Sequence, residues 1–187
     1  MSDGAESALA LQPAFADISI AKDRSIYSLL GSTLTSGVMG KLSTIQTGIA
    51  GEYFVAAELT RRGLVASLTL RNTRGIDILA SNVDATKSVG IQVKTKCGNK
   101  PDWILNKKAE IDVAENLFYV FVLFEELDTP QYYIVPRATV ANFCRESHKA
   151  RLTAPGKAGN QHKDTDMRKF QDPKGVYRDR WDLLGLT

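Results

Sequence analysis

Hydrophobic and polar positions follow a helical period near the beginning of the folded part of the chain. Apolar residues recur at intervals of four, seven and three positions at Ile45, Ile49, Ala56 and Leu59. This is the spacing of an amphipathic helix. Ser43 or Thr44 can cap its start, and Gly63 is suited to end it. The pattern predicts a helix from about residue 43 to about residue 62.

After Gly63 the apolar residues occur in short runs separated by turn-forming residues, which is typical of β-strands. The predicted strands cover residues 64–70, 76–80, 89–96, 117–124 and 132–135. Pro136 is suited to the first position of a helix, so a second helix is expected through about His148. The order of elements predicts an α/β protein.

The predicted strand 89–96 has two different faces. Because side chains alternate along a strand, Ile91 and Val93 lie on one face, and Gln92 and Lys94 lie on the other. A connection of hairpin size separates this strand from Asp77 in the preceding strand. We therefore expect Asp77 and Gln92 to come together on adjacent strands.

Length and composition limit the class of protein. A chain of 187 residues, 43% of them hydrophobic and 24% charged, suits one globular domain. We expect residues 1–42 to form an N-terminal arm and residues 43–187 to form the domain. The longest apolar run, 117–124, is far shorter than a membrane-spanning helix. The acidic N-terminus is unlike a secretory signal and two cysteines suit a reducing compartment, so a cytoplasmic protein is expected.

The formal net charge of +3 hides a strong alternation along the chain. Residues 61–108 carry ten basic and three acidic side chains, and residues 145–180 carry ten basic and five acidic. Residues 109–144, between them, carry one basic and six acidic side chains. The two basic segments can be ordinary solvated surface, or they can fold onto one face that binds phosphates.

Four residues have chemistry that stands out, although each also has an ordinary structural interpretation. Glu52 falls in the apolar stripe of the predicted helix, where a carboxylate needs a cationic partner, either a metal or an arginine. Asp77 is a charge inside an apolar strand, and such residues also occur at turns and edges. Gln92 and Lys94 share a strand face that can equally be its solvent side. Jointly they supply oxygen ligands for a hard cation and a nearby lysine, as metal-dependent phosphodiester hydrolysis requires.

Two other arrangements compete for a functional role. Cys144 and His148 are four residues apart on the predicted second helix, with His162 and Asp164 downstream. A second closely spaced Cys or His pair is missing from this set, so the pattern disfavours zinc. Trp103 lies among lysines and can stack on a base, but a core position is commoner for tryptophan.

Three motifs occur in order, namely GIAGEYFVAAEL with Glu52, GIDILA with Asp77, and GIQVKT with Gln92 and Lys94. The set resembles the PD-(D/E)xK nuclease superfamily, and looks closest to the small stand-alone members related to archaeal Holliday-junction resolvases. The matched stretch covers roughly residues 45–96. Gln92 departs from the family, which more often has Glu or Asp there. Glutamine keeps a carbonyl oxygen but removes one negative charge.

The resemblance implies a restriction-endonuclease-like core, in which helices flank a central mixed β-sheet in the order αβββαβ. Asp77 would be the principal ligand of Mg²⁺ or Mn²⁺, with Glu52 and Gln92 as further ligands. The main-chain carbonyl of Val93 would add a ligand, and Lys94 would orient the attacking water. The implied activity is divalent-metal-dependent endonucleolytic hydrolysis of DNA phosphodiester bonds.

The first basic segment supplies the expected contacts to DNA phosphates. These are Arg61, Arg71, Arg74, Lys96, Lys100, Lys107 and Lys108. Cutting two strands with one site per subunit usually requires a pair, so a homodimer is plausible, with the N-terminal arm as a docking segment. The alternative function is a module of the same fold that binds nucleic acid or protein without cutting, which Gln92 favours.

Overall fold

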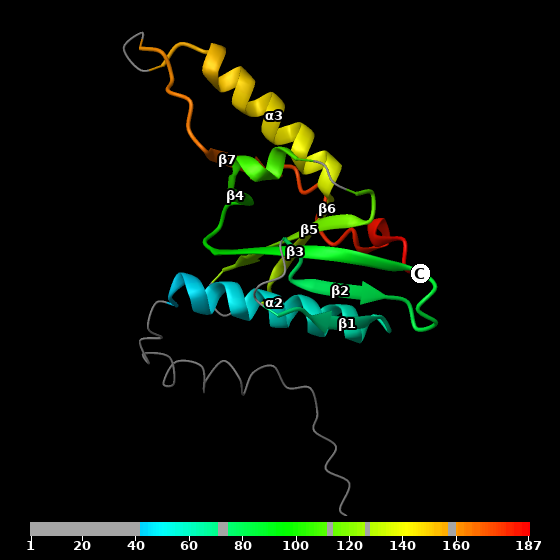
Figure 1. Ribbon diagram of the computed structural model, residues 1–187. Helices are drawn as coiled ribbons and strands as arrows, with labels where there is room; N and C mark the ends of the chain where they lie inside the picture. The colour runs from blue at the N-terminus through cyan, green and yellow to red at the C-terminus, as the bar shows by residue number, and fades with distance from the viewer. Residues whose placement is uncertain (1–41, 71–74, 112–113, 126–127, 157–159) are drawn as a thin grey trace, which may run out of the picture. The chain divides into compact units, whose positions relative to one another are not determined.

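The computed structural model describes residues 42–70, 75–111, 114–125, 128–156 and 160–187 (Figure 1). All of these belong to one unit, Leu42–Thr187. The predicted N-terminal arm, residues 1–42, lies outside the described residues apart from Leu42.

The predicted first helix is confirmed as α2 (Thr44–Arg61). Ser43 caps it in a reciprocal capping box: its hydroxyl accepts the Gln46 N–H at 3.2 Å, and the Gln46 side chain accepts the Ser43 N–H at 3.0 Å. A cap of this kind contributes about 1 kcal/mol. Gly63 follows the helix with a φ of +80°, a left-handed conformation that glycine adopts without strain.

The predicted apolar stripe of α2 is only partly right. The buried positions are Thr47, Gly51, Val55 and Leu59, whereas Ile45 is 67% exposed. Gly51 explains the shift, because a Cβ atom there would come within 1.7 Å of Thr95 Oγ1 on the adjacent strand. The absent side chain lets the helix approach the sheet closely, so small residues rather than isoleucines decide which side of α2 is buried.

The central sheet contains five strands and is mixed, which confirms the expected fold class, an α/β protein with helices flanking a mixed sheet. The strands are β1 (Val65–Leu68), β2 (Ile78–Ser81), β3 (Ser88–Cys97), β5 (Leu117–Phe124) and β6 (Gln131–Pro136). They lie in the order β1-β2-β3-β5-β6. All neighbours are antiparallel except β3 and β5, which are parallel.

Two further strands, β4 (Asp102–Asn106) and β7 (Met167–Gln171), are missing from the sequence prediction. They pair antiparallel in a separate two-stranded sheet. The crossover from β3 to β5 runs through β4 and the 3-10 helix η1 (Lys107–Glu110), where the order αβββαβ has an α-helix. β4 and β7 are separated by about 60 residues of sequence. No hairpin turn connects them, so the local sequence does not indicate that they pair.

Helix α3 (Arg137–Thr153) follows β6, with Pro136 at its N-cap, and continues beyond the predicted end at His148. A short 3-10 helix, η3 (Trp181–Leu184), lies near the C-terminus. No helix in the described ranges is long and apolar enough to span a membrane.

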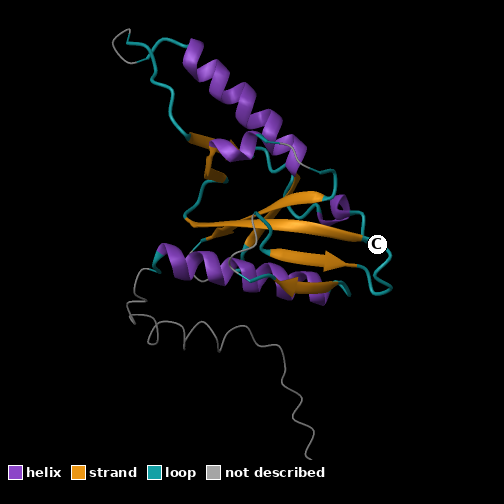
Figure 2. Ribbon diagram, viewed as in Figure 1, coloured by secondary structure: helices purple, strands orange, loops and turns teal. Residues whose placement is uncertain are grey.

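Helix α2 lies on one face of the central sheet, and α3 with β4 and β7 lies on the other (Figure 2). The buried apolar side chains form two hydrophobic cores. On β5, Val120 and Val122 belong to the core under α2, whereas Phe121 belongs to the core beneath α3 and the β4–β7 sheet. Burial on both faces explains the uninterrupted apolar run 117–124. Trp103 lies in the α3-side core, with its Nε1–H donating to the Val122 carbonyl at 3.1 Å. Its interpretation as a core residue is therefore confirmed.

Candidate functional site

A polar pocket of about 300 Å³ lies between the N-terminal half of α2 and the segments that leave β1 and enter β2. Its two acidic side chains are Glu52 and Asp77. Glu52 lies on α2 and Asp77 immediately precedes β2, and both are half-buried. The structure therefore brings together two of the four chemically distinctive residues in one cavity.

Asp77 is held by hydrogen bonds to two neighbouring segments. Its Oδ2 accepts the Val93 N–H at 2.7 Å, and its own N–H donates to the Ile91 carbonyl at 2.8 Å. Thr69 holds the other side: its N–H donates to the Asp77 carbonyl at 2.9 Å, and its hydroxyl donates to the Ile76 carbonyl at 2.6 Å. These contacts fix both the backbone and one carboxylate oxygen of Asp77.

Two glycines shape the α2 wall of the pocket. Gly51, next to Glu52, allows the close approach of α2 to β3 described above. Gly48 lies one turn earlier and lines the pocket, and a Cβ atom there would meet nothing within 4 Å. One glycine is thus required for packing, whereas the other leaves open space beside the carboxylates.

Gln92 and Lys94 lie on β3 on either side of Val93, the residue that binds Asp77. The pairing of Ile78 with Ile91 makes β2 and β3 an antiparallel hairpin, as expected. Ile91 and Val93 are buried, and Gln92 and Lys94 are half-buried on the opposite face. Neither Gln92 nor Lys94 is among the residues that line the 300 Å³ pocket.

The donor set of the pocket suits a hard divalent cation that keeps part of its hydration shell. Within the described ranges, no group of three or more His, Cys, Asp or Glu residues is arranged to hold a metal. Mg²⁺ is usually bound through only one or two carboxylates and several waters. The carboxylates of Glu52 and Asp77 therefore fit such an ion.

The predicted phosphate-binding residues that the structure describes do not line this pocket. Arg61 is nine residues beyond Glu52 on α2, about 14 Å along the axis, and forms an ion pair with Glu58 at 2.8 Å. Hydrogen bonding to Arg61 lowers the pKa of the Glu58 carboxyl. Lys107 pairs with Asp166 at 2.9 Å, which raises the pKa of Lys107.

The other predicted basic residues have different surroundings. Lys96 pairs with Asp102 at 2.6 Å, and Lys169 binds the other oxygen of the same carboxylate at 2.6 Å. The hydrogen bonds from Lys169 and Lys96 lower the pKa of Asp102. Lys100 and Lys108 are exposed. The predicted contacts Arg71 and Arg74 lie outside the described residues.

The sequence interpretation missed Thr69 and Asp102. Thr69 follows β1 and holds the backbone at Ile76 and Asp77 by hydrogen bonds, and a single threonine at the end of a strand carries no signal of that role. Asp102 joins β3 to the β4–β7 sheet through Lys96 and Lys169. Its role could not be read from the sequence because β4 and β7 were not predicted.

The zinc arrangement is not supported. Cys144 is buried in the α3-side core, and burial raises the pKa of its thiol to about 11, which disfavours a thiolate ligand. His148 instead contacts Asp164, with 2.8 Å between Nε2 and Oδ1. The helix spacing of Cys144 and His148 thus reflects core packing and a surface contact.

Comparisons with known proteins find only a distant structural similarity. No protein-family model matches the sequence, and no curated protein matches it. Among solved structures, the chain is similar to Hjc, a Holliday junction resolvase from the archaeal hyperthermophile Archaeoglobus fulgidus. The match has 15% sequence identity and a TM-score of 0.36, and covers 70% of this chain and 91% of Hjc. Functional assignment therefore depends on the chemistry of Glu52, Asp77 and their neighbours on β3.

Proposed function

We propose that this protein is a divalent-metal-dependent endonuclease that hydrolyses phosphodiester bonds in DNA. The observation that carries the proposal is the meeting of Glu52 and Asp77 in one pocket, with the Asp77 carboxylate bound to the main chain between Gln92 and Lys94. A pair of carboxylates that can hold a divalent ion meets the first requirement of metal-assisted phosphodiester hydrolysis.

In this proposal Asp77 and Glu52 hold Mg²⁺ or Mn²⁺, and the Gln92 amide oxygen and the Val93 carbonyl complete the protein ligands. When bound, the ion supplies a Lewis acid that polarises the phosphate. The Val93 N–H fixes the orientation of the Asp77 carboxylate. The ammonium group of Lys94 donates to the attacking water, orients it and stabilises the negative charge that develops on the phosphoryl oxygens.

DNA phosphates would be bound first by basic residues with no acidic partner. Lys100 and Lys108 are exposed, and neither forms an ion pair with another described residue. Arg61, Lys96 and Lys107 would bind phosphate only by exchanging a carboxylate for it. Arg71 and Arg74 belong to the same proposal. Because one site cuts one strand, cleavage of a duplex would require two chains, so the proposal includes a homodimer.

The test is cleavage of supercoiled plasmid and of branched DNA with Mg²⁺ or Mn²⁺. Asp77→Asn and Lys94→Ala should each lower the rate by about a hundredfold or more, since each removes a group that stabilises developing charge. Matched controls are Asp84→Asn and Lys87→Ala, in the turn between β2 and β3, which should retain full activity. Cleavage that survives both site substitutions would refute this site.

A binding module that does not cut is the second candidate. It is favoured by the uncharged Gln92 and by the fact that the described lining of the pocket contains only two carboxylates. Such a module would bind DNA in a salt-dependent manner but would show no cleavage with either metal. Gln92→Glu separates the candidates: restoring a third carboxylate should produce or increase metal-dependent cleavage only if the remaining site is competent.

A further inference from the structure

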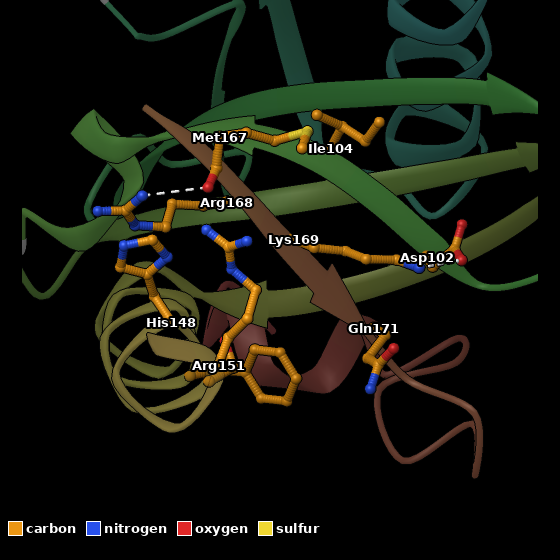
Figure 3. Close-up of a pocket in the computed structure, with 10 residues that line it drawn as sticks. Asp102, Ile104, His148, Arg151, Met167, Arg168, Lys169 and Gln171 are labelled. Atoms are coloured by element: carbon orange, nitrogen blue, oxygen red, sulfur yellow. Dashed lines mark hydrogen bonds and ion pairs between the residues drawn. The ribbon is translucent and has the colours of Figure 1, made fainter. Parts of the chain in front are cut away.

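A groove of about 410 Å³ lies between α3 and the two-stranded β4–β7 sheet (Figure 3). Ile104, Met167 and Lys169 line it from the strands, and Phe143 and Arg151 line it from the helix. The groove is on the α3 side of the central sheet, whereas the Glu52–Asp77 pocket is bounded by α2. It is therefore a separate feature of the molecule.

The strand wall of the groove carries two large exposed apolar side chains. Ile104 is 70% exposed and Met167 is 57% exposed, although their strand neighbours Trp103 and Arg168 are buried. A single exposed apolar residue is ordinary, but two that line one cavity form a surface suited to a bulky apolar group. The cavity is large enough for such a side chain and open enough to admit it from a partner.

The groove is also positively charged. The Asp102 carboxylate lies between Lys96 and Lys169, so this trio retains one net positive charge. Arg168 is neutralised by Glu110, and the Asp164 carboxylate beside His148 offsets at most one of the remaining positive charges. Arg151 donates to the Lys163 carbonyl at 3.0 Å and has no carboxylate partner among the described residues, so its charge is not neutralised. In Figure 3 the side chain of Arg151 extends from α3 toward β7.

We propose that this groove binds an acidic peptide segment of a partner protein. A bulky apolar side chain of the peptide occupies the cavity beside Ile104 and Met167, and flanking carboxylates bind Arg151 and Lys169. The groove combines an apolar wall with a positive rim. It is therefore complementary to a peptide that carries both an apolar side chain and carboxylates, rather than to a ligand that has only one of them. This inference does not depend on the proposed nuclease activity.

Nucleic acid fits the same groove less well. Phosphates need accessible cations but gain nothing from Ile104 and Met167, and a base needs an aromatic platform. Of the two rings in the described lining, Phe143 packs edge-on against Phe170, with 5.1 Å between ring centroids, and His148 contacts Asp164 at 2.8 Å. A peptide with an apolar side chain and acidic neighbours would contact both the apolar wall and the basic side chains of the groove.

The test is selection from a displayed random-peptide library on the full-length protein, with counter-selection on Arg151→Glu and on Met167→Glu. The enriched peptides should combine Asp or Glu with Leu, Ile, Met or Phe. In fluorescence polarisation, both variants should weaken binding of an enriched peptide by about tenfold or more, because each removes one part of the recognition. Replacing the apolar residue of the peptide with Ser should have a similar effect.

Two matched variants control for charge and exposure. Val83→Glu places a carboxylate at another exposed apolar residue, and Lys87→Glu reverses another exposed charge. Both should bind the peptide as the wild type does, and circular dichroism should show all four variants folded. No enrichment, or enrichment that the groove variants do not affect, overturns the proposal. Binding of a single-stranded oligonucleotide that displaces the peptide and is lost in the same variants would assign the groove to nucleic acid instead.

Discussion

The pocket at Asp77 and the groove beside Asp102 each contain a half-buried aspartate, but the two carboxylates are held in opposite ways. Asp102 accepts one ammonium group on each oxygen, from Lys96 and from Lys169, at 2.6 Å. Asp77 accepts a neutral main-chain N–H on one oxygen, from Val93 at 2.7 Å. Two ammonium partners more than neutralise a carboxylate, whereas an amide orients it and leaves its charge in place.

An aspartate held by a main-chain N–H keeps its negative charge available to a cation, whereas two ammonium partners already compensate the charge of Asp102. Both aspartates come from the segment 61–108, which is strongly basic in sequence. The fold places them in different surroundings, so the α2-side pocket is acidic and the α3-side groove is basic. Opposite ligand classes are therefore expected at the two sites.

The largest expected effect concerns the helix that forms one wall of the acidic pocket. Gly51→Ala should destabilise the protein by about 1–3 kcal/mol, because the added Cβ meets Thr95 Cβ at 2.8 Å as well as its hydroxyl, and side-chain rotation cannot relieve both contacts. Gly48→Ala should instead stabilise by up to about 1 kcal/mol, since its site is open and alanine favours the helix. Denaturant unfolding measures both.

Opposite signs for these two glycines would confirm that close packing of α2 on β3 holds Glu52 in position. Thr95→Ala in the Gly51→Ala background should recover only part of the lost free energy, because it removes the hydroxyl and methyl groups but keeps the Cβ atom at 2.8 Å. Equal effects at Gly48 and Gly51 would mean that helix propensity alone governs this helix.

The two aspartates should differ in how they respond to a divalent metal. Mg²⁺ or Mn²⁺ at about ten times its dissociation constant should increase the free energy of unfolding by about 1.4 kcal/mol. Asp77→Asn should abolish this increment, whereas Asp102→Asn should retain it even though it lowers the baseline stability. Thermal unfolding with and without metal measures the increment. Loss of the increment in both variants, or in neither, would contradict the assignment of the metal to Asp77.

Part of this site could be predicted from the sequence because its elements are local. Helical spacing and the Ser43 cap located α2, and two-residue alternation gave the correct faces for Ile91 and Gln92. The apolar stripe was wrong at Ile45 because hydrophobicity does not reveal that Gly51 allows the closest approach. Periodicity predicts that a helix forms more reliably than it predicts which of the helix residues are buried.

The basic groove could not be predicted, for a different reason. Pairing of β4 with β7 joins Ile104 to Lys169 across a long separation in sequence, and each strand is only five residues long. The charges of Lys96 and Lys107 suggested phosphate contacts, yet each lies beside a carboxylate that only the folded chain brings near. The net charge of a segment predicts neither the pairing of distant strands nor the ion pairs that form in the folded chain.

The third prediction concerns Thr69, whose hydrogen bonds hold the backbone at Ile76 and Asp77. Thr69→Val keeps the side-chain shape but removes the hydroxyl that donates to the Ile76 carbonyl at 2.6 Å. Metal affinity should fall by about tenfold, as for the loss of other groups that orient a ligand. The matched control is Thr60→Val, which removes a hydroxyl bonded to the Ala56 carbonyl at 2.9 Å, away from the pocket. An equal loss of metal affinity in both variants would exclude a positioning role for Thr69.

The smallest expected effect concerns the ion pairs of Asp102. Asp102→Asn should cost about 1 kcal/mol or less near neutral pH, since Lys169 is half exposed and such pairs are weak. Because Lys169 and Lys96 lower the pKa of Asp102 below its ordinary value of 3.8, the unfolded chain takes up the proton first as pH falls. The stabilisation is therefore complete above pH 3.8 and is lost as pH falls through the lowered pKa of the folded state. The free energies of unfolding of wild type and Asp102→Asn should accordingly converge in acid, whereas a difference independent of pH would show that Asp102 contributes through packing and not through its charge.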